Sequence, residues 1–228
     1  MKNIFGSFSR TDFGLWAVSE LVIIVSFLLF DRENYITFAA SMIGAASLIF
    51  CAKGNPVGQV LIIIFAALYA VISFRFRYYG EMITYLGMTA PMAVLALISW
   101  LRNMSGENSS EVAVNRLERK EYLFIAFLTA VVTFIFYFIL KAFNTANLFI
   151  STLSITTSFS ASYLTFRRSP FYALAYAAND LILIILWTLG AVSDISCLTM
   201  ISCFVIFLIN DFYGFISWKK MQHRQQSA

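Results

Sequence analysis

Apolar residues in this chain are gathered into eight long stretches that are separated by short polar segments. A helix needs about 20 predominantly apolar residues to cross the roughly 30 Å hydrocarbon core of a bilayer, and each stretch comes close to that length. The pattern therefore predicts an all-α membrane protein with eight transmembrane helices, at residues 13–30, 36–52, 56–74, 81–101, 122–140, 147–165, 170–191 and 195–218.

The prolines fall at informative places in this pattern. Pro56 and Pro170 each stand at the start of a stretch, where the missing backbone N–H costs little. Pro91 lies inside the fourth stretch and predicts a kink there, because the helix loses one backbone hydrogen bond at a proline.

Short matching segments indicate an internal repeat. The sequence Ile-Ser-Trp ends the fourth stretch at Trp100 and ends the eighth at Trp218, 118 residues later, and Pro56 and Pro170 are 114 residues apart. The nearly equal offsets predict two parallel three-helix repeats, as in the SWEET arrangement, joined by one connecting helix and preceded by one extra helix. The expected organisation is an N-terminal helix at 1–35, a first repeat at 36–101, a linker and connecting helix at 102–143, a second repeat at 144–220 and a polar tail at 221–228.

Basic residues set the expected orientation. With eight spans, both termini share one side with the second, fourth and sixth loops, and this side holds all of the 16 Lys and Arg residues except Arg32, Arg75, Arg77 and Lys141. Because Lys and Arg concentrate in cytoplasmic loops, we expect a multi-pass protein of the cytoplasmic membrane with both termini in the cytoplasm.

Composition excludes several other classes. Hydrophobic residues make up 60% of the chain and charged residues 12%, about half the share usual in soluble domains. The lone His223 and the unpaired spacing of Cys51, Cys197 and Cys203 speak against metal clusters and Ser-His-Asp catalysis, so we expect no catalytic residues, metal or cofactor. A net charge of +4, spread over short loops, gives no nucleic-acid patch.

The most informative polar residues interrupt the seventh stretch. Asn179 and Asp180 lie near its middle, where an acid is costly and normally faces a protein interior or a water-filled cavity. On a helix, Tyr176, Asp180 and Trp187 fall within about 40° of one line. This face predicts the wall of a binding site for an aromatic, polar and cationic solute.

Other stretches contribute weaker candidates. Thr157 and Ser158 in the sixth stretch and Tyr69 in the third either face a solute or bond between helices. Asn210 and Asp211 in the eighth stretch repeat the acid-to-tryptophan spacing of the seventh, although Asp211 also suits a structural pairing near the cytoplasmic interface. Simpler roles are expected for two further acids, a helix contact for Glu20 and a helix N-terminal charge for Glu81.

Three segments resemble the PnuC family of nicotinamide riboside transporters, namely residues 44–54 (GAASLIFCAKG), 79–82 (YGEM) and 176–187 (YAANDLILIILW). The resemblance implies facilitated diffusion of a pyridinium nucleoside through a cavity between two three-helix units, with trapping by a cytoplasmic kinase. It also implies close relatives that carry thiamine or riboflavin, and it is compatible with a homo-oligomer. The expected partners are therefore a small-molecule substrate, the lipid bilayer and that kinase.

Family resemblance also implies roles for individual residues. Asn179 and Asn210 would bond the ribose or carboxamide, Asp180 would offset the positive ring, and Trp187 and Trp100 would stack on it. Many members carry a Trp-x-x-Trp pair where this chain has Leu97 and Trp100, which leaves thiamine or riboflavin as alternative substrates. Proton-coupled transport through Asp180 is the alternative mechanism. An intramembrane enzyme is the alternative class of protein.

Overall fold

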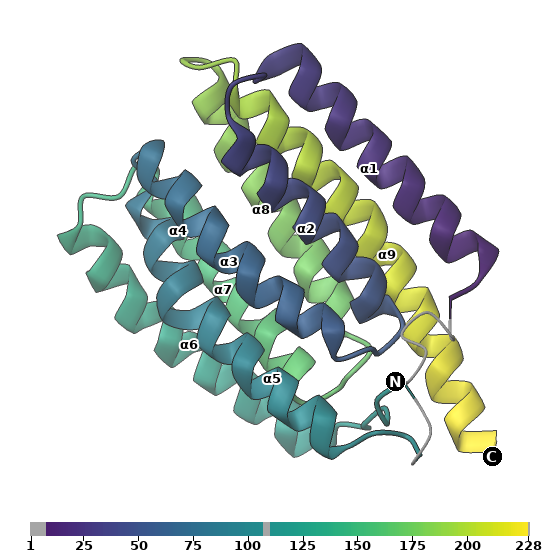
Figure 1. Cartoon of the computed structure of the whole chain (residues 1–228). Coiled ribbons are helices and arrows are strands. Elements are labelled where there is room, and N and C mark those ends of the chain that lie inside the picture. The colour runs from purple at the N-terminus through teal and green to yellow at the C-terminus, as the bar shows by residue number, and fades with distance from the viewer. Residues whose placement is uncertain (1–7, 107–109, 228) are drawn as a thin grey trace.

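The computed structural model describes residues 8–106 and 110–227, which form a bundle of long helices packed side by side (Figure 1). The helical segments are α1 (Arg10–Phe30), α2 (Tyr35–Ala52), α3 (Val57–Arg75), α4 (Tyr79–Thr84), η1 (Tyr85–Thr89), α5 (Ala90–Arg102), α6 (Arg119–Ala142), α7 (Leu148–Phe166), α8 (Tyr172–Ala191) and α9 (Cys197–Ser227). Within the described residues, extended pairing is limited to one isolated bridge between Met104 and Val112. The all-helical prediction is confirmed.

Within residues 8–106 and 110–227, seven helical segments are long and apolar enough to cross a membrane. They are α1, α2, α3, the continuous segment Tyr79–Arg102, α6, α8 and α9. The remaining long helix, α7, carries Ser or Thr at nearly every turn, which lowers its apolar character. Residues 8–106 and 110–227 thus form a multi-pass membrane protein.

The outer helices present apolar side chains to their surroundings. Leu21 and Leu29 of α1 and Leu123 and Phe127 of α6 are all more than half exposed. Large apolar side chains in such numbers suit contact with lipid tails rather than water. The buried side chains instead lie between α2, α3, α7, α8 and α9, which places the core in the middle of the bundle.

Two similar turns begin α3 and α8. In one, Gly54 has a φ of 62° two residues before Pro56; in the other, Arg168 has a φ of 57° two residues before Pro170. The left-handed conformation is easy for glycine and costs about 1 kcal/mol for other residues, yet both turns adopt it. Equal backbone geometry at positions 114 residues apart agrees with the spacing of the two prolines.

The fourth predicted span is irregular just before Pro91. Residues Tyr85–Thr89 form a π-helical turn in which the N–H of Ala90 donates to the carbonyl of Tyr85. A proline cannot donate the next helical hydrogen bond, so the chain relieves the mismatch in the preceding turn. The predicted interruption is therefore found, as a wider turn that changes the direction of the side chains before it.

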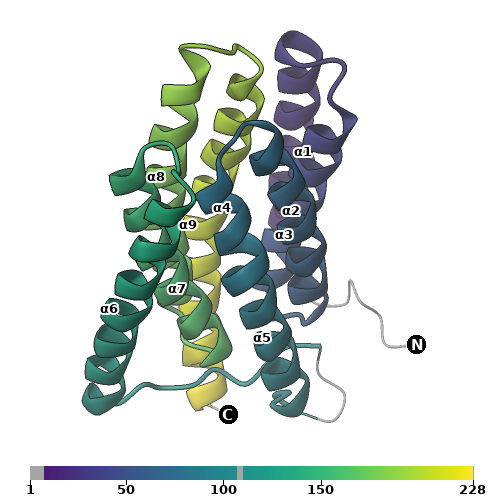
Figure 2. The same ribbon diagram turned by 90° about the vertical axis from the view of Figure 1, so that its left-hand side faces the viewer.

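Both ends of the described chain lie at the same end of the bundle (Figure 2). Residues 110–118, which lead to α6, cross this same end past the C-terminal part of α9. Loops α1–α2, α3–α4, α6–α7 and α8–α9 lie at the opposite end.

Candidate functional site

A small cavity of about 40 Å³ lies inside the bundle, between helices from both halves of the chain. Its apolar walls include Phe65 of α3 and Phe207 of α9. Its polar lining comes from Ser47 of α2, Tyr85 and Thr89 of η1, Ser158 of α7, Tyr176, Asn179 and Asp180 of α8, and Asp211 of α9.

Asn179 joins α8 to the hydroxyl-rich face of α7. Its side-chain oxygen accepts hydrogen bonds from Thr157 at 2.9 Å, from Ser158 at 2.8 Å and from Ser154 at 3.4 Å. The Asn179 side chain is buried, so these three donors replace the water it would otherwise bind. The arrangement fixes the amide at the cavity wall and leaves its NH₂ group as a donor for a bound molecule.

Two carboxyl groups give the cavity its charge. Asp180 and Asp211 both line it and are both buried, on the packed helices α8 and α9. One oxygen of Asp180 has no hydrogen-bond partner among the described residues. No Lys or Arg in the described part of the chain lines this cavity, so a cation is the ligand that such a site would stabilise.

Aromatic rings form a second layer behind the lining. Trp187 is fully buried and donates its indole N–H to the Tyr69 hydroxyl at 2.9 Å. The Tyr69 ring in turn lies 4.2 Å from the ring of Tyr85, which lines the cavity. Trp187 and Tyr69 are therefore brought together, one layer behind the lining, while Tyr176 reaches the cavity and contacts Ser162 at 3.1 Å.

Trp100 and Asn210 lie away from the cavity. The indole of Trp100 donates to the carbonyl of Thr165 at 2.9 Å and packs against Trp218. Trp100 is near the C-terminal end of α5, the helix end that lies with the termini in Figure 2. The Asn210 amide donates to Ser19 of α1 at 3.2 Å. The Asn210 side-chain oxygen is buried without a hydrogen-bond partner among the described residues. The Trp100 indole is held by contacts within the bundle, so this conformation does not place it opposite Trp187.

Several lining residues escaped the sequence analysis. Tyr85 and Thr89 reach the cavity because the π-helical turn redirects them, and the available signal was Pro91, which marked the irregularity but not its direction. Glu81 lies in the first turn of α4, the helix start predicted for it, where it is fully buried and accepts from Ser154 at 3.4 Å. Ser47 of α2 was not predicted, because the pattern of its helix gives no sign of which neighbour it faces.

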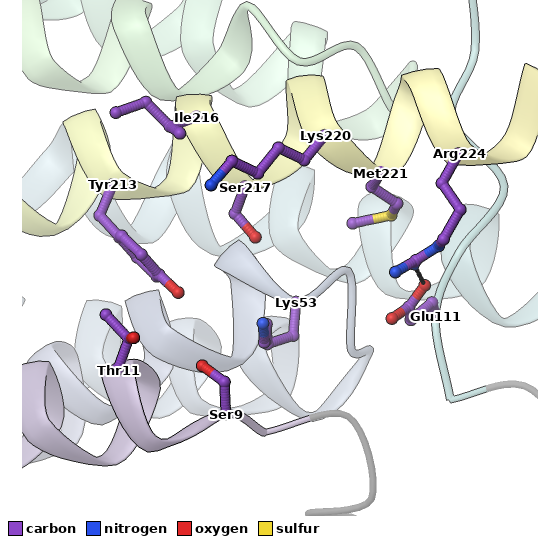
Figure 3. Close-up of a pocket in the computed structure, with 10 residues that line it drawn as sticks. All are labelled: Ser9, Thr11, Lys53, Glu111, Tyr213, Ile216, Ser217, Lys220, Met221 and Arg224. Carbon is purple, nitrogen blue, oxygen red and sulfur yellow. Dashed lines mark hydrogen bonds and ion pairs between the residues drawn. The ribbon is translucent and has the colours of Figure 1, made fainter.

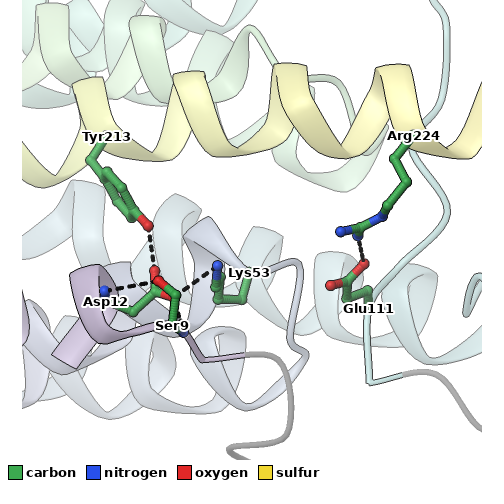
Figure 4. A network of polar contacts seen from close by, with 6 residues as sticks. All are labelled: Ser9, Asp12, Lys53, Glu111, Tyr213 and Arg224. Carbon is green, nitrogen blue, oxygen red and sulfur yellow. Dashed lines mark hydrogen bonds and ion pairs between the residues drawn. The ribbon is translucent and has the colours of Figure 1, made fainter.

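A second cavity, of about 260 Å³, opens near the termini between α1, α9 and the ends of neighbouring loops (Figure 3). Beside it, Asp12 is fully buried, binds Lys53 at 2.9 Å and accepts from the Tyr213 hydroxyl (Figure 4). The carboxylate thereby ties α1 to α2 and α9, and Glu111 pairs with Arg224 nearby. These paired charges hold the helices together at this end of the bundle.

The described residues hold no group of acidic, His and Cys side chains suited to a metal.

Comparison with known proteins agrees with this arrangement. The family model described as nicotinamide mononucleotide transporter matches residues 34–220. A nicotinamide riboside transporter PnuC from Neisseria mucosa is 24% identical over 226 residues, 94% of this chain and 86% of the relative. The protein of the same name from Haemophilus influenzae is 24% identical over 193 residues, 84% of this chain and 82% of the relative.

A crystal structure of the vitamin B3 transporter PnuC shares the fold, with a TM-score of 0.87 at 22% identity, covering 98% of this chain and 97% of that one. The family match spans most of the chain, including every helix that contributes to the central cavity. This chain therefore belongs to the nicotinamide mononucleotide transporter family and is a membrane transporter, not an enzyme.

Proposed function

We propose that this protein carries nicotinamide riboside across the cytoplasmic membrane by facilitated diffusion. The relatives from Neisseria and Haemophilus are named for that substrate. The observation that carries the proposal is the central cavity itself, in which two carboxyl groups, an amide and aromatic rings surround a space without Lys or Arg among the described residues.

The charge of the cavity favours the riboside over the mononucleotide. The pyridinium ring of nicotinamide riboside is positive, and Asp180 and Asp211 stabilise a positive group strongly where water is scarce. A mononucleotide adds a phosphate with a charge of about −1.5 to −2 near neutral pH. That phosphate would meet carboxylates and find no cationic partner in the lining, so we expect much weaker binding.

Residues in and behind the lining have separate roles in this proposal. Asp180 offsets the positive ring, and Asn179 donates to the ribose or carboxamide while Thr157 and Ser158 hold it in place. Tyr176 provides an aromatic wall, supported from behind by the Tyr69 and Trp187 pair. Contacts from Trp100 and Asn210 would require the bundle to rearrange, because their N–H groups are bonded elsewhere.

Transport requires the cavity to grow and open. A space of about 40 Å³ holds roughly one water molecule, far less than a nucleoside needs. We propose that α2–α5 and α7–α9 act as two parallel three-helix repeats that move against each other, with α6 as connector and α1 as an added helix. In this arrangement α7 crosses the membrane as the eighth span, and both termini face the cytoplasm.

Two partners complete the proposed pathway. Facilitated diffusion only equalises concentrations, so net uptake needs a reaction that removes the free riboside inside the cell. Phosphorylation by a cytoplasmic kinase supplies this step, since the charged product no longer suits the acidic cavity. Assembly of the chain into a homo-oligomer is part of the same proposal and is tested by the mass of the detergent-purified complex.

Calorimetric titration of the purified protein with nicotinamide riboside, its mononucleotide, thiamine and riboflavin tests the substrate. We expect the riboside to bind at least tenfold more tightly than the other three compounds. Asp180→Asn should weaken riboside binding by about 10- to 100-fold, the effect of losing one close charge partner in a low-dielectric site.

Glu20→Gln is the matched control, because it also neutralises a partly buried acid but lies on α1, where its partner is Trp16. It should leave binding unchanged. Tighter binding of thiamine or riboflavin would keep the transport mechanism but replace the substrate. A mononucleotide that binds as well as the riboside would contradict the charge argument.

Proton coupling is the second candidate mechanism, favoured by the two buried acids, Asp180 and Asp211, that line one small cavity. Buried acids within membrane spans form the proton relays of many transporters, so these two carboxyl groups are able to hold and release a proton there. Uptake into proteoliposomes with and without an imposed pH gradient separates the mechanisms. Facilitated diffusion predicts equal initial rates, and proton coupling predicts that the gradient accelerates uptake.

A further inference from the structure

Two buried tryptophans join the halves of the bundle at the end that holds the termini. Trp100 of α5 donates its indole N–H to the carbonyl of Thr165 in α7 at 2.9 Å, and Trp218 of α9 donates to the carbonyl of Cys51 in α2 at 2.7 Å. Both rings are fully buried, with centroids 5.4 Å apart. Each indole therefore bonds across to the other three-helix group, and the two bonds are reciprocal.

The linker after α5 runs across this indole pair. Residues 111–115, which we call the strap, bond to both groups through the backbone: Val112 N–H donates to the carbonyl of Gly54, and Asn115 N–H donates to the carbonyl of Arg168, each at 3.0 Å. Gly54 and Arg168 are the left-handed residues of the two similar turns, 114 positions apart. One short segment thus connects equivalent carbonyls of the two groups.

Side chains hold the strap in place. Val112 is fully buried and belongs to the same apolar cluster as Trp100 and Trp218. Gln225 of α9 brackets the strap, since its side-chain oxygen accepts from Val114 N–H at 2.8 Å and its amide donates to the Val112 carbonyl at 3.1 Å. The strap therefore covers the indole pair on the side that faces away from the central cavity.

Attachment of the strap to the two groups is unequal. It continues from α5 of the first group, and Ala113 N–H donates to the carbonyl of Asn103 at 2.8 Å. Its ties to the second group run largely through the last turns of α9, where Arg224 pairs with Glu111 while the Arg224 side chain is 65% exposed (Figure 4). Water replaces an exposed ion pair easily, whereas the first group holds the strap through the continuous chain and through backbone bonds from Val112 and Ala113.

We propose that the strap governs opening of the transporter at this end: it stays with the first group and releases α9 when the two groups separate. Glu111, Arg224 and Gln225 are then positioning residues for transport, because they set how readily the end opens without touching the cavity. The proposal rests on the movement of two three-helix groups put forward above. It assigns a transport function to the linker and to the C-terminal end of α9.

Cross-linking tests the predicted separation. In a chain with its native cysteines replaced by alanine, Glu111→Cys with Arg224→Cys joins the strap to α9, and Asn103→Cys with Ala113→Cys joins it to the first group. Both pairs are treated with the same short, cleavable bifunctional thiol reagent, and uptake of labelled nicotinamide riboside into proteoliposomes is measured before and after. The untreated double variants give the basal rates.

We expect the strap-to-α9 cross-link to reduce uptake at least tenfold and its cleavage to restore the rate. The cross-link between Asn103 and Ala113 should change uptake less than twofold. Riboside binding measured by calorimetry should persist in both cross-linked forms, which separates a failure to open from damage to the cavity. Unchanged uptake at complete strap-to-α9 cross-linking would overturn the proposal, and so would equal loss of uptake in the control pair.

Hydrogen exchange gives a readout that does not depend on the substrate. Arg224→Gln and Gln225→Ala should each raise the exchange rates of the Val114 and Asn115 amides several-fold, because these amides bond to the second group. The Ala113 amide, bonded to the first group, should keep its rate. A uniform rise across residues 112–115 would contradict the unequal attachment, even if the protein proved to carry another substrate.

Discussion

Side chains around the central cavity form two layers. Residues of the outer layer do not line the cavity and affect binding only by positioning the residues that do. Trp187 does not line the cavity, but its indole N–H bonds the Tyr69 hydroxyl at 2.9 Å, and Tyr69 packs on the lining residue Tyr85. A buried hydrogen bond of this kind contributes about 1 kcal/mol net and fixes the orientation of both rings. The position of Tyr85 therefore depends on a bond one layer away.

Removing either partner of this bond should have the same effect on binding. Trp187→Phe and Tyr69→Phe each delete the hydrogen bond while keeping an aromatic ring, and each should weaken riboside binding by about five- to tenfold, which corresponds to roughly 1 kcal/mol. The double variant should bind no more weakly than the worse single variant, because both changes remove one shared interaction. Calorimetric titration of the four proteins measures this coupling.

Trp16→Phe is the control, since Trp16 also bonds a side chain on its own helix, Glu20 at 2.7 Å, but lies on α1 away from the cavity. It should leave riboside affinity unchanged. Additive losses in the double variant would show that Trp187 and Tyr69 act on the substrate independently.

Residue-level predictions from the sequence had a physical limit. An acid in an apolar span must find a polar environment, and that rule drew attention to Asp180, which lines the cavity. The same rule left the role of Asp211 open, because helical periodicity gives the face of a residue but not the neighbour that the face meets. For Trp100 the apolar ring and its N–H suit a binding site and a helix contact equally, and in this conformation the contact is with Thr165.

Among the helical segments, the π-helical turn contributes most directly to the cavity. It supplies Tyr85 and Thr89 to the lining from a span whose remaining residues pack elsewhere. An α-helix advances about 100° per residue, so one extra residue in a turn rotates everything before it by about that angle. The wide turn is therefore what directs Tyr85 toward Asp180 and Asn179.

Deleting Gly87 should convert the wide turn to regular α-helix and abolish riboside binding. The deletion rotates Tyr85 away from the cavity by about 100° while leaving the apolar character of the span intact. We expect a membrane-inserted, monodisperse protein whose riboside affinity falls at least 30-fold, measured by calorimetry.

Gly87→Ala is the matched control, because an added Cβ at this position meets no atom within 4 Å. It should bind the riboside normally, and if it also lost binding, the effect of the deletion could not be assigned to the helical register. Normal binding by the deletion variant would contradict a role for the wide turn.

Element boundaries were the most predictable part of the structure. The predicted span at 170–191 corresponds to α8, Tyr172–Ala191, and the span at 36–52 corresponds to α2, Tyr35–Ala52. These bounds are predictable because the length of an apolar stretch and the turns beside it depend on local residues. The predicted end of the last span at 218 falls short of the helix, which continues to Ser227. This extension is polar and is held by the strap through Arg224 and Gln225, a tertiary contact that local hydropathy does not report.

At the scale of the whole molecule, bonds between the two proposed three-helix groups lie at both ends of the bundle. At the end opposite the termini, Tyr78 donates its hydroxyl to the carbonyl of Leu186 at 3.2 Å. At the terminal end, the reciprocal bonds of Trp100 and Trp218 and the strap hold the groups together. A transporter must break one set while keeping the other, so the balance between the sets decides which side opens.

Weakening the terminal set should shift this balance toward opening at the termini. Trp100→Phe with Trp218→Phe removes two hydrogen bonds between the groups, which together contribute about 2 kcal/mol to the closed state. Their loss raises the population open at this end by roughly 30-fold. Cys51 is a built-in reporter, because it is 1% exposed and its carbonyl accepts the Trp218 bond. Alkylation of Cys51, followed by peptide mass spectrometry, should accelerate by a similar factor in the double variant.

Cys203 serves as the internal control in the same sample. It is fully buried in the apolar cluster that contains Trp187, away from the indole pair, and opening at the termini leaves that cluster closed. Its alkylation rate should therefore stay constant while that of Cys51 rises. Equal acceleration at both cysteines would indicate general loosening of the bundle, and no acceleration at Cys51 would mean that the reciprocal bonds do not hold this end shut. Only a selective rise at Cys51 fits two groups that separate at one end while the other set of bonds keeps the opposite end closed.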